Sequence, residues 1–133
     1  MNKELINKLI ERARHAGENA YCPYTNAPVG CGLLVDDNII FGGCNIENAS
    51  LPSSATAGQV AILKAVSEGS TTFRAIAFWS ADRLPYPDGL TRQTLSEFCP
   101  KQSLPIIIAN DKTFVMTDLS DLFPYPPEAP IED

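Results

Sequence analysis

The chain has 133 residues, of which 44% are hydrophobic and 20% charged, and its formal net charge is −6. These values are typical of one globular domain, spanning residues 1–133. They disfavour nucleic acid as a partner, because an acidic surface repels phosphates, and no apolar stretch has the length of a membrane span. We therefore expect a cytoplasmic protein that binds small neutral molecules or other proteins.

The chain has four cysteines and one histidine. No two cysteines form a C-x-x-C pair, and His15 lies far from most of them in sequence. Zinc clusters have closer and more regular ligand spacings. The sequence therefore predicts buried, reduced thiols rather than disulfides or a metal cluster. The cysteines are Cys22, Cys31, Cys44 and Cys99.

The first half of the chain predicts a helix, a hairpin and a second helix. Apolar residues recur at helical spacing over 3–16, and Gly17 ends that helix. Two strands over 28–35 and 39–44, joined by a turn, form the hairpin. The second helix is expected over 54–69. Its start is attributed to Pro52, Ser53 and Ser54, and its apolar positions are Val60, Ile62, Leu63 and Val66.

The second half predicts strands and helices in alternation. Residues 73–80 are strongly apolar and indicate a strand buried on both faces, and a loop rich in proline follows. A helix over 90–98, strands over 104–110 and 113–116, and a helical turn capped by Thr117 come next. Residues 124–133 hold several prolines and predict an extended tail. The whole order predicts an α/β fold, with a mixed five-stranded sheet and helices on both faces.

Five segments carry a resemblance to a known family. They are "YCPYTNAPVG" (21–30), "GCNIENAS" (43–50), "AILKAVSEG" (61–69), "RQTLSEFCP" (92–100) and "DLFP" (121–124). In collinear order they resemble the small cytidine deaminases. That resemblance implies a three-layer α/β/α fold and an oligomer, a dimer or tetramer, whose pockets neighbouring subunits complete. It also implies a bound nucleoside and a zinc-activated water that attacks the cytosine ring.

The residues that the resemblance assigns to the chemistry differ from the family pattern. The pattern is Cys or His, one residue and Glu at one helix start, and Pro-Cys-x-x-Cys at another. Thr56 and Gly58 stand at the first pair of positions, and Asp88 and Thr91 at the paired cysteines. Hydroxyls and one carboxylate are poor zinc ligands. The sequence therefore predicts no metal, no cofactor and no catalytic residue for hydrolytic deamination.

Other positions are expected to bind a ligand. The resemblance assigns Asn45 and Glu47 to the ribose, because a carboxylate and an amide suit a sugar diol; both could instead fix a turn after the second strand. Ala57 is included in this group. Ala27 stands where the family has an aromatic residue, and Tyr125 is shifted from a second aromatic position. Losing a stacking partner weakens the binding of a base.

Ser53, Ser54, Thr56 and Gly58 allow two interpretations. The hydroxyls can be helix caps, with Gly58 a neutral change that costs about 1 kcal/mol of helix propensity. Alternatively, the helix N-terminus can attract a phosphate or carboxylate into the space that a glycine leaves. The first interpretation is favoured.

Three hypotheses for function follow. The first is a family member without zinc that binds a nucleoside or serves as a partner subunit, with itself or with an active relative. The second is an enzyme of altered chemistry, in which Glu47 and Asp88 cleave an N-glycosidic bond. The third is conventional deamination of cytidine by a metal arrangement that the sequence does not reveal.

Overall fold

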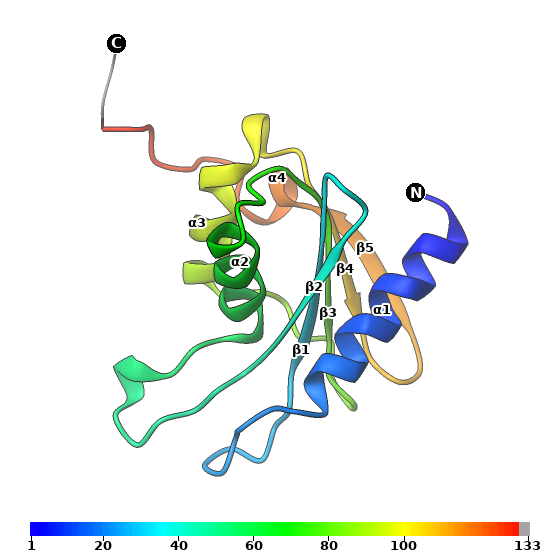
Figure 1. Cartoon of the computed structure of the whole chain (residues 1–133), viewed down its shortest axis with the longest axis vertical. Helices are drawn as coiled ribbons and strands as arrows, with labels where there is room; N and C mark the ends of the chain where they lie inside the picture. The colour runs from blue at the N-terminus through cyan, green and yellow to red at the C-terminus, as the bar shows by residue number, and fades with distance from the viewer. Residues whose placement is uncertain (131–133) are drawn as a thin grey trace.

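The computed structural model describes residues 1–130, and within them five strands form one mixed sheet in the order β2-β1-β3-β4-β5. Strands β3 and β4 run parallel, and every other neighbouring pair is antiparallel. The elements are α1 (Lys3–Gly17), β1 (Gly30–Val35), β2 (Ile40–Cys44), the 3-10 turn η1 (Leu51–Ser53), α2 (Ala57–Ser67), β3 (Phe73–Trp79), α3 (Gly89–Phe98), the 3-10 turn η2 (Pro100–Gln102), β4 (Pro105–Ala109), β5 (Phe114–Asp118) and α4 (Leu119–Leu122). Figure 1 shows their arrangement along the chain.

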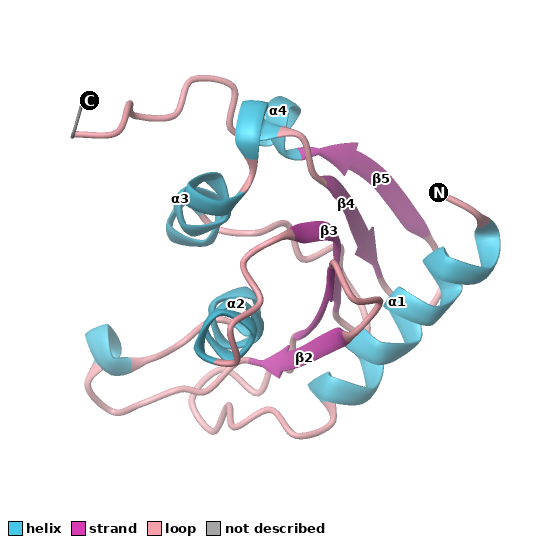
Figure 2. Ribbon diagram, turned by 45° about the horizontal axis from the view of Figure 1, so that its top comes forward, coloured by secondary structure: helices cyan, strands magenta, loops and turns pink. Residues whose placement is uncertain are grey.

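Helices cover both faces of the sheet, as the sequence predicts. Figure 2 shows α1 on one face and α2 and α3 on the other. Side chains of β4 alternate between the two layers: Ile106 and Ile108 face α2 and α3, and Ile107 packs under α1. Both sets are fully buried. The alternation with period two explains why this strand is apolar at every position. The prediction of a three-layer α/β/α fold is therefore confirmed.

The start of α2 differs from the prediction. Residues 51–53 form a separate 3-10 turn, and α2 begins only at Ala57. Thr56 is its cap, because its backbone is extended and its Oγ1 accepts a hydrogen bond from Gln59 N at 3.3 Å. Ser54 Oγ instead accepts from Asn48 N at 3.0 Å. The predicted start at Ser53 and Ser54 is therefore wrong, and the structural cap is Thr56.

Other boundaries change by a few residues. The first strand starts at Gly30, because Val29 N already donates to the Asn45 side chain. Helix α2 ends at Ser67, and Leu63 on its predicted apolar face is 60% exposed. Thr117 lies within β5, and Asp118 caps α4 by accepting from Ser120 N at 3.1 Å. Thr117 is therefore not the cap of α4.

The C-terminal segment and the cysteines follow the predictions in part. Residues 124–130 form neither helix nor strand, and Tyr125 is 91% exposed; the rest of the predicted tail, 131–133, lies outside the described residues. All four cysteines are free, but only Cys31 and Cys99 are buried. None of the helices within residues 1–130 is long and apolar enough to cross a membrane.

A close approach at Gly43 positions the first turn of α2. A Cβ on Gly43 would lie 2.5 Å from Ala57 O and 2.6 Å from Ala61 N, distances at which atoms overlap. Only glycine therefore lets this helix rest directly on β2. Because α2 starts at this contact, its capping residue is held beside the end of the sheet, where a cavity opens.

Candidate functional site

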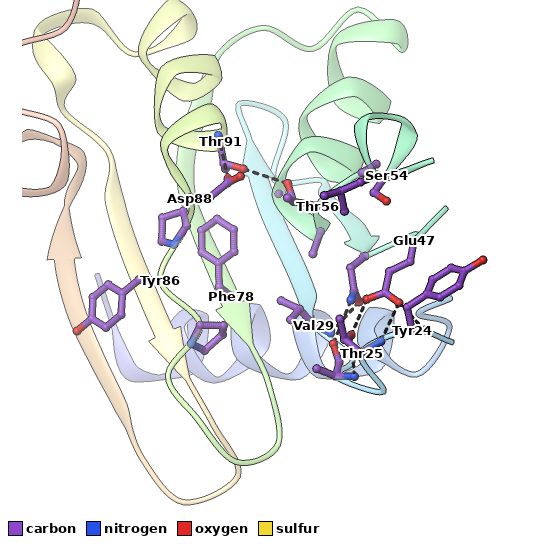
Figure 3. Close-up of a pocket in the computed structure, with 18 of the residues that line it drawn as sticks. Tyr24, Thr25, Val29, Glu47, Ser54, Thr56, Phe78, Tyr86, Asp88 and Thr91 are labelled. Carbon is purple, nitrogen blue, oxygen red and sulfur yellow. Dashed lines mark hydrogen bonds between the residues drawn. The ribbon is translucent and has the colours of Figure 1, made fainter. Parts of the chain in front are cut away.

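A cavity of about 860 Å³ opens beside the N-termini of α2 and α3. Three segments line it: the loop before β1, the stretch from the end of β2 into α2, and the stretch from β3 into α3 (Figure 3). The structure brings eight sequence-predicted site residues into this lining, although it does not test their roles, whereas Ser53 and Tyr125 do not belong to it. The eight residues are Ala27, Asn45, Glu47, Thr56, Ala57, Gly58, Asp88 and Thr91.

A hydrogen bond joins the two helix starts. Thr56 Oγ1 and Thr91 Oγ1 lie 3.0 Å apart, and either hydroxyl can donate. Asp88 caps α3, because its Oδ1 accepts from Thr91 N at 3.0 Å. Thr91 is buried, so its hydroxyl needs a partner and finds it in Thr56. This chain differs from the family pattern at four positions, and three of them, Thr56, Asp88 and Thr91, are thus joined by hydrogen bonds (Figure 3).

The space beside Gly58 is filled. A Cβ at this position would lie 2.6 Å from Thr91 Cγ2 and 2.9 Å from Phe78 Cε1. The less favoured interpretation, in which Gly58 leaves space for an anion, therefore does not hold for the direction in which a side chain at this position would extend, and the favoured interpretation of Gly58 as a neutral change does not account for this packing. The Thr91 methyl group and the Phe78 ring occupy the place into which a side chain at position 58 would extend. Gly58 is accordingly required by packing as the structure stands.

Asn45 fixes the loop that leads into β1. Its Oδ1 accepts from Val29 N at 2.9 Å, and its Nδ2 donates to Ala27 O at 3.0 Å. This is the turn-fixing role that the sequence leaves open. An amide has two N–H groups and two lone pairs on its oxygen, so one donor and one lone pair of Asn45 are not used by these bonds. The side chain can therefore fix the loop and also contact a ligand.

Glu47 binds the same loop from the other side. Its Oε1 accepts from Tyr24 N at 2.9 Å and Thr25 N at 3.2 Å, and its Oε2 accepts from the Thr25 hydroxyl. The hydrogen bond from Thr25 lowers the pKa of Glu47 below its ordinary value of 4.5, with smaller help from the two backbone N–H groups. A carboxyl that is held ionised serves as an acceptor rather than as a proton donor. This favours hydrogen bonding over the acid role in glycosidic cleavage, a role that stays a prediction.

Several aromatic side chains of the cavity were not predicted from the sequence. Phe78 is buried in β3 and lines the cavity, and Tyr24 and Tyr86 line it from two loops. The alternation of β3 does not reveal Phe78, because both faces of that strand are apolar. The loop tyrosines follow prolines and carry no periodic signal. These rings provide aromatic surface although Ala27 does not.

The donor atoms of the cavity are oxygen and nitrogen. No cysteine or histidine belongs to its lining, and His15 lies on α1, which packs on the opposite face of the sheet. Within residues 1–130, no three side chains of His, Cys, Asp or Glu are grouped closely enough to hold a metal ion. The cavity carries two carboxylates, Glu47 and Asp88, and one cation, Arg83.

Comparisons with known proteins agree on one family. A family model described as the cytidine and deoxycytidylate deaminase zinc-binding region matches residues 3–100. A cytidine deaminase of Sporosarcina psychrophila is 41% identical over 108 residues, which cover 80% of this chain and 79% of the relative. A cytidine deaminase of Halalkalibacterium halodurans is 42% identical over 93 residues, covering 69% and 70%.

Solved structures give the same result. The crystal structure of cytidine deaminase from Burkholderia pseudomallei superposes with a TM-score of 0.85 at 34% identity and covers 95% of this chain and 99% of that chain. The crystal structure of cytidine deaminase from Mycobacterium tuberculosis gives a TM-score of 0.80 at 30% identity, covering 92% and 97%. At these identities the two structures resemble this chain in sequence as well as in fold.

The packing beside Gly58 predicts coupled stability effects. Gly58→Ala adds a methyl group against Thr91 Cγ2, and we expect overpacking of about 1–3 kcal/mol to outweigh the gain in helix propensity of about 1 kcal/mol. Thr91→Ser removes that methyl group and keeps the hydroxyl. Gly58→Ala should therefore cost less in the Thr91→Ser background, measured as free energy of unfolding in urea. Equal costs in the two backgrounds would contradict the packing described above.

Proposed function

We propose that this chain, which belongs to the cytidine and deoxycytidylate deaminase family, binds a nucleoside in the cavity and does not deaminate it with zinc. The observation that carries the proposal is the donor set at the two helix starts. In this family, zinc supplies the Lewis acid that activates a water. The residues present decide whether that group fits.

The donor set of this chain does not fit zinc. Structural and catalytic zinc sites use thiolate, imidazole and some carboxylate ligands in a tetrahedral arrangement. Here the corresponding positions supply two hydroxyls and one carboxylate. The hydroxyls of Thr56 and Thr91 are bonded to each other, and Asp88 Oδ1 accepts from a backbone N–H. A neutral hydroxyl already engaged in a hydrogen bond is a weak ligand for a borderline-soft cation.

The proton shuttle is also missing from its expected position. Gly58 has no side chain, and Thr91 and Phe78 fill the adjacent space. Without a Lewis acid or a positioned base, a water in the cavity keeps the high pKa of bulk water and is a poor nucleophile at neutral pH. These two features together support a chain that binds without hydrolysing.

The cavity suits a nucleoside in its chemistry. Glu47 accepts three hydrogen bonds from the loop, and a carboxylate can accept about four. One lone pair on Oε2 is therefore left for a sugar hydroxyl, and Asn45, which lines the same cavity, has an unused donor. The exposed rings of Tyr24 and Tyr86 offer flat apolar surfaces for a base, and the buried ring of Phe78 forms part of the cavity wall. Such a mixture of apolar walls and few polar groups is typical of small-molecule sites.

We further propose that the chain assembles, as a homo-oligomer (dimer or tetramer) or as a partner subunit of an active relative. Several large apolar side chains are exposed: Leu51, at 80%, and Tyr86, at 49%, line the cavity, and Leu90, at 60%, precedes the lining residue Thr91. Interfaces in many proteins use exposed apolar side chains, where these gather in one patch. Multi-angle light scattering of the purified protein, alone and mixed with an active relative, measures the assembly. A monomer in both samples would contradict it.

The absence of zinc chemistry predicts two results for the wild-type protein. After expression with added zinc, elemental analysis should find far less than one zinc per chain. Overnight incubation with cytidine should yield no uridine by liquid chromatography with mass spectrometry. A stoichiometric zinc content or a uridine product would contradict the proposal, and free cytosine would instead support cleavage of the N-glycosidic bond.

A variant provides the matched control for the zinc result. Thr56→Cys, Gly58→Glu, Asp88→Cys and Thr91→Cys, combined, restore the family pattern and also remove the Thr91 methyl group that blocks position 58. This variant should take up zinc. If it folds and takes up none, the positions assigned to the zinc ligands are wrong.

Nucleoside binding is tested at Glu47. Glu47→Gln keeps the shape of the side chain but removes its charge, so cytidine affinity measured by calorimetry should fall roughly tenfold. Thr25→Ala is the control, because it loosens the loop contact and leaves the carboxylate in place; its effect should be smaller. Unchanged affinity in Glu47→Gln would contradict the ribose contact. Equal losses in both variants would assign Glu47 to the loop alone.

A further inference from the structure

We infer that Asp88 determines which base the cavity accepts, by taking hydrogen bonds from an exocyclic amino group. The cavity would then bind a pyrimidine base that carries an amino group in preference to the matching base that carries a second carbonyl. This inference rests on the proposed nucleoside binding and adds a specificity-determining residue to it. It concerns a residue that stands where the family pattern has a metal ligand.

Asp88 has hydrogen-bonding capacity that the protein does not use. Its Oδ1 accepts one bond, from Thr91 N, and no bond from the described residues reaches its Oδ2. The ion pairs within residues 1–130 are made by Arg14 and His15 of α1, so no cation pairs with Asp88. The residue is exposed and lines the cavity. A carboxylate in this state can accept further hydrogen bonds and can donate none while it is ionised.

The position of Asp88 is fixed by its surroundings. Its backbone is extended at the start of α3, with φ −71° and ψ 172°, and its own cap bond orients the carboxylate. Arg92 holds the preceding residue, because its Nε donates to Pro87 O at 2.7 Å, and it holds the end of α4 through Leu122 O at 2.9 Å. A group that is held in place loses little freedom when it binds a ligand.

Two hydroxyl groups lie beside Asp88 at this end of the cavity. The bond between Thr56 and Thr91 uses one of the two hydroxyl hydrogens and leaves the other available to donate, and Thr56 Oγ1 also accepts from Gln59 N. Figure 3 shows these groups beside Asp88, apart from Glu47 and Tyr24. A base that turned a carbonyl toward Asp88 would oppose lone pair to lone pair. An amino group there would donate a hydrogen bond to the carboxylate. Asp88 therefore attracts the base that carries the amino group and repels the base that carries the carbonyl.

Cytidine and uridine provide the test, because they differ at one exocyclic group. Calorimetry should give an affinity for cytidine about tenfold or more above that for uridine in the wild-type protein. Asp88→Asn keeps a good helix cap and adds an N–H donor, so the preference should fall to about one or reverse in favour of uridine. Asp82→Asn is the matched control, since Asp82 lies on the same loop outside the cavity lining, and it should keep the wild-type preference.

The outcomes separate this inference from the proposed function. If wild-type protein binds both nucleosides equally, or if Asp88→Asn keeps the preference for cytidine, the role of Asp88 is overturned while nucleoside binding stands. If wild-type protein binds neither nucleoside, the proposed function is overturned and this inference with it. A loss of preference in Asp82→Asn as well would assign the effect to the loop and overturn the role of Asp88.

Discussion

The geometry of the cavity depends on one hydrogen bond, between the hydroxyls of Thr56 and Thr91. It joins the N-termini of α2 and α3, two helices that follow different strands and pack on the same face of the sheet. Gly43 allows the first of them to rest on β2, and the second is held by Arg92. These contacts hold both helix starts in place, and the hydrogen bond between Thr56 and Thr91 forms one end of the cavity.

The residues at this end form a consistent set of contacts. The hydroxyl of Thr91 satisfies that of Thr56, its methyl group fills the space beside Gly58, and Phe78 closes the same space from β3. No buried side-chain nitrogen or oxygen within residues 1–130 is left without a partner. Packing and hydrogen bonding that agree in this way are typical of a sequence that specifies one stable structure. They fit the proposal of a nucleoside-binding site without zinc.

The sequence predicts the fold well and the contacts of the site less well. The apolar runs of β3 and β4 and the helical spacing of α1 are strong local signals, so these elements were confirmed. The caps depend on which hydroxyl or carboxylate meets a particular N–H, so Thr56 and Asp118 replaced the residues expected. The family resemblance selected Asn45, Glu47, Asp88 and Thr91 as site residues, and all four line the same cavity in the structure. It could not reveal that Thr91 fills the space beside Gly58, because that contact joins two helices far apart in the chain.

Native mass spectrometry of the wild-type protein, mixed with zinc and cytidine, tests zinc-free nucleoside binding most directly. It preserves non-covalent complexes and resolves zinc, cytidine and uridine by mass in one spectrum. We expect each chain to carry one intact cytidine and no zinc. A species that carries zinc with uridine, or a chain that carries neither zinc nor nucleoside at saturating cytidine, would contradict the proposed function.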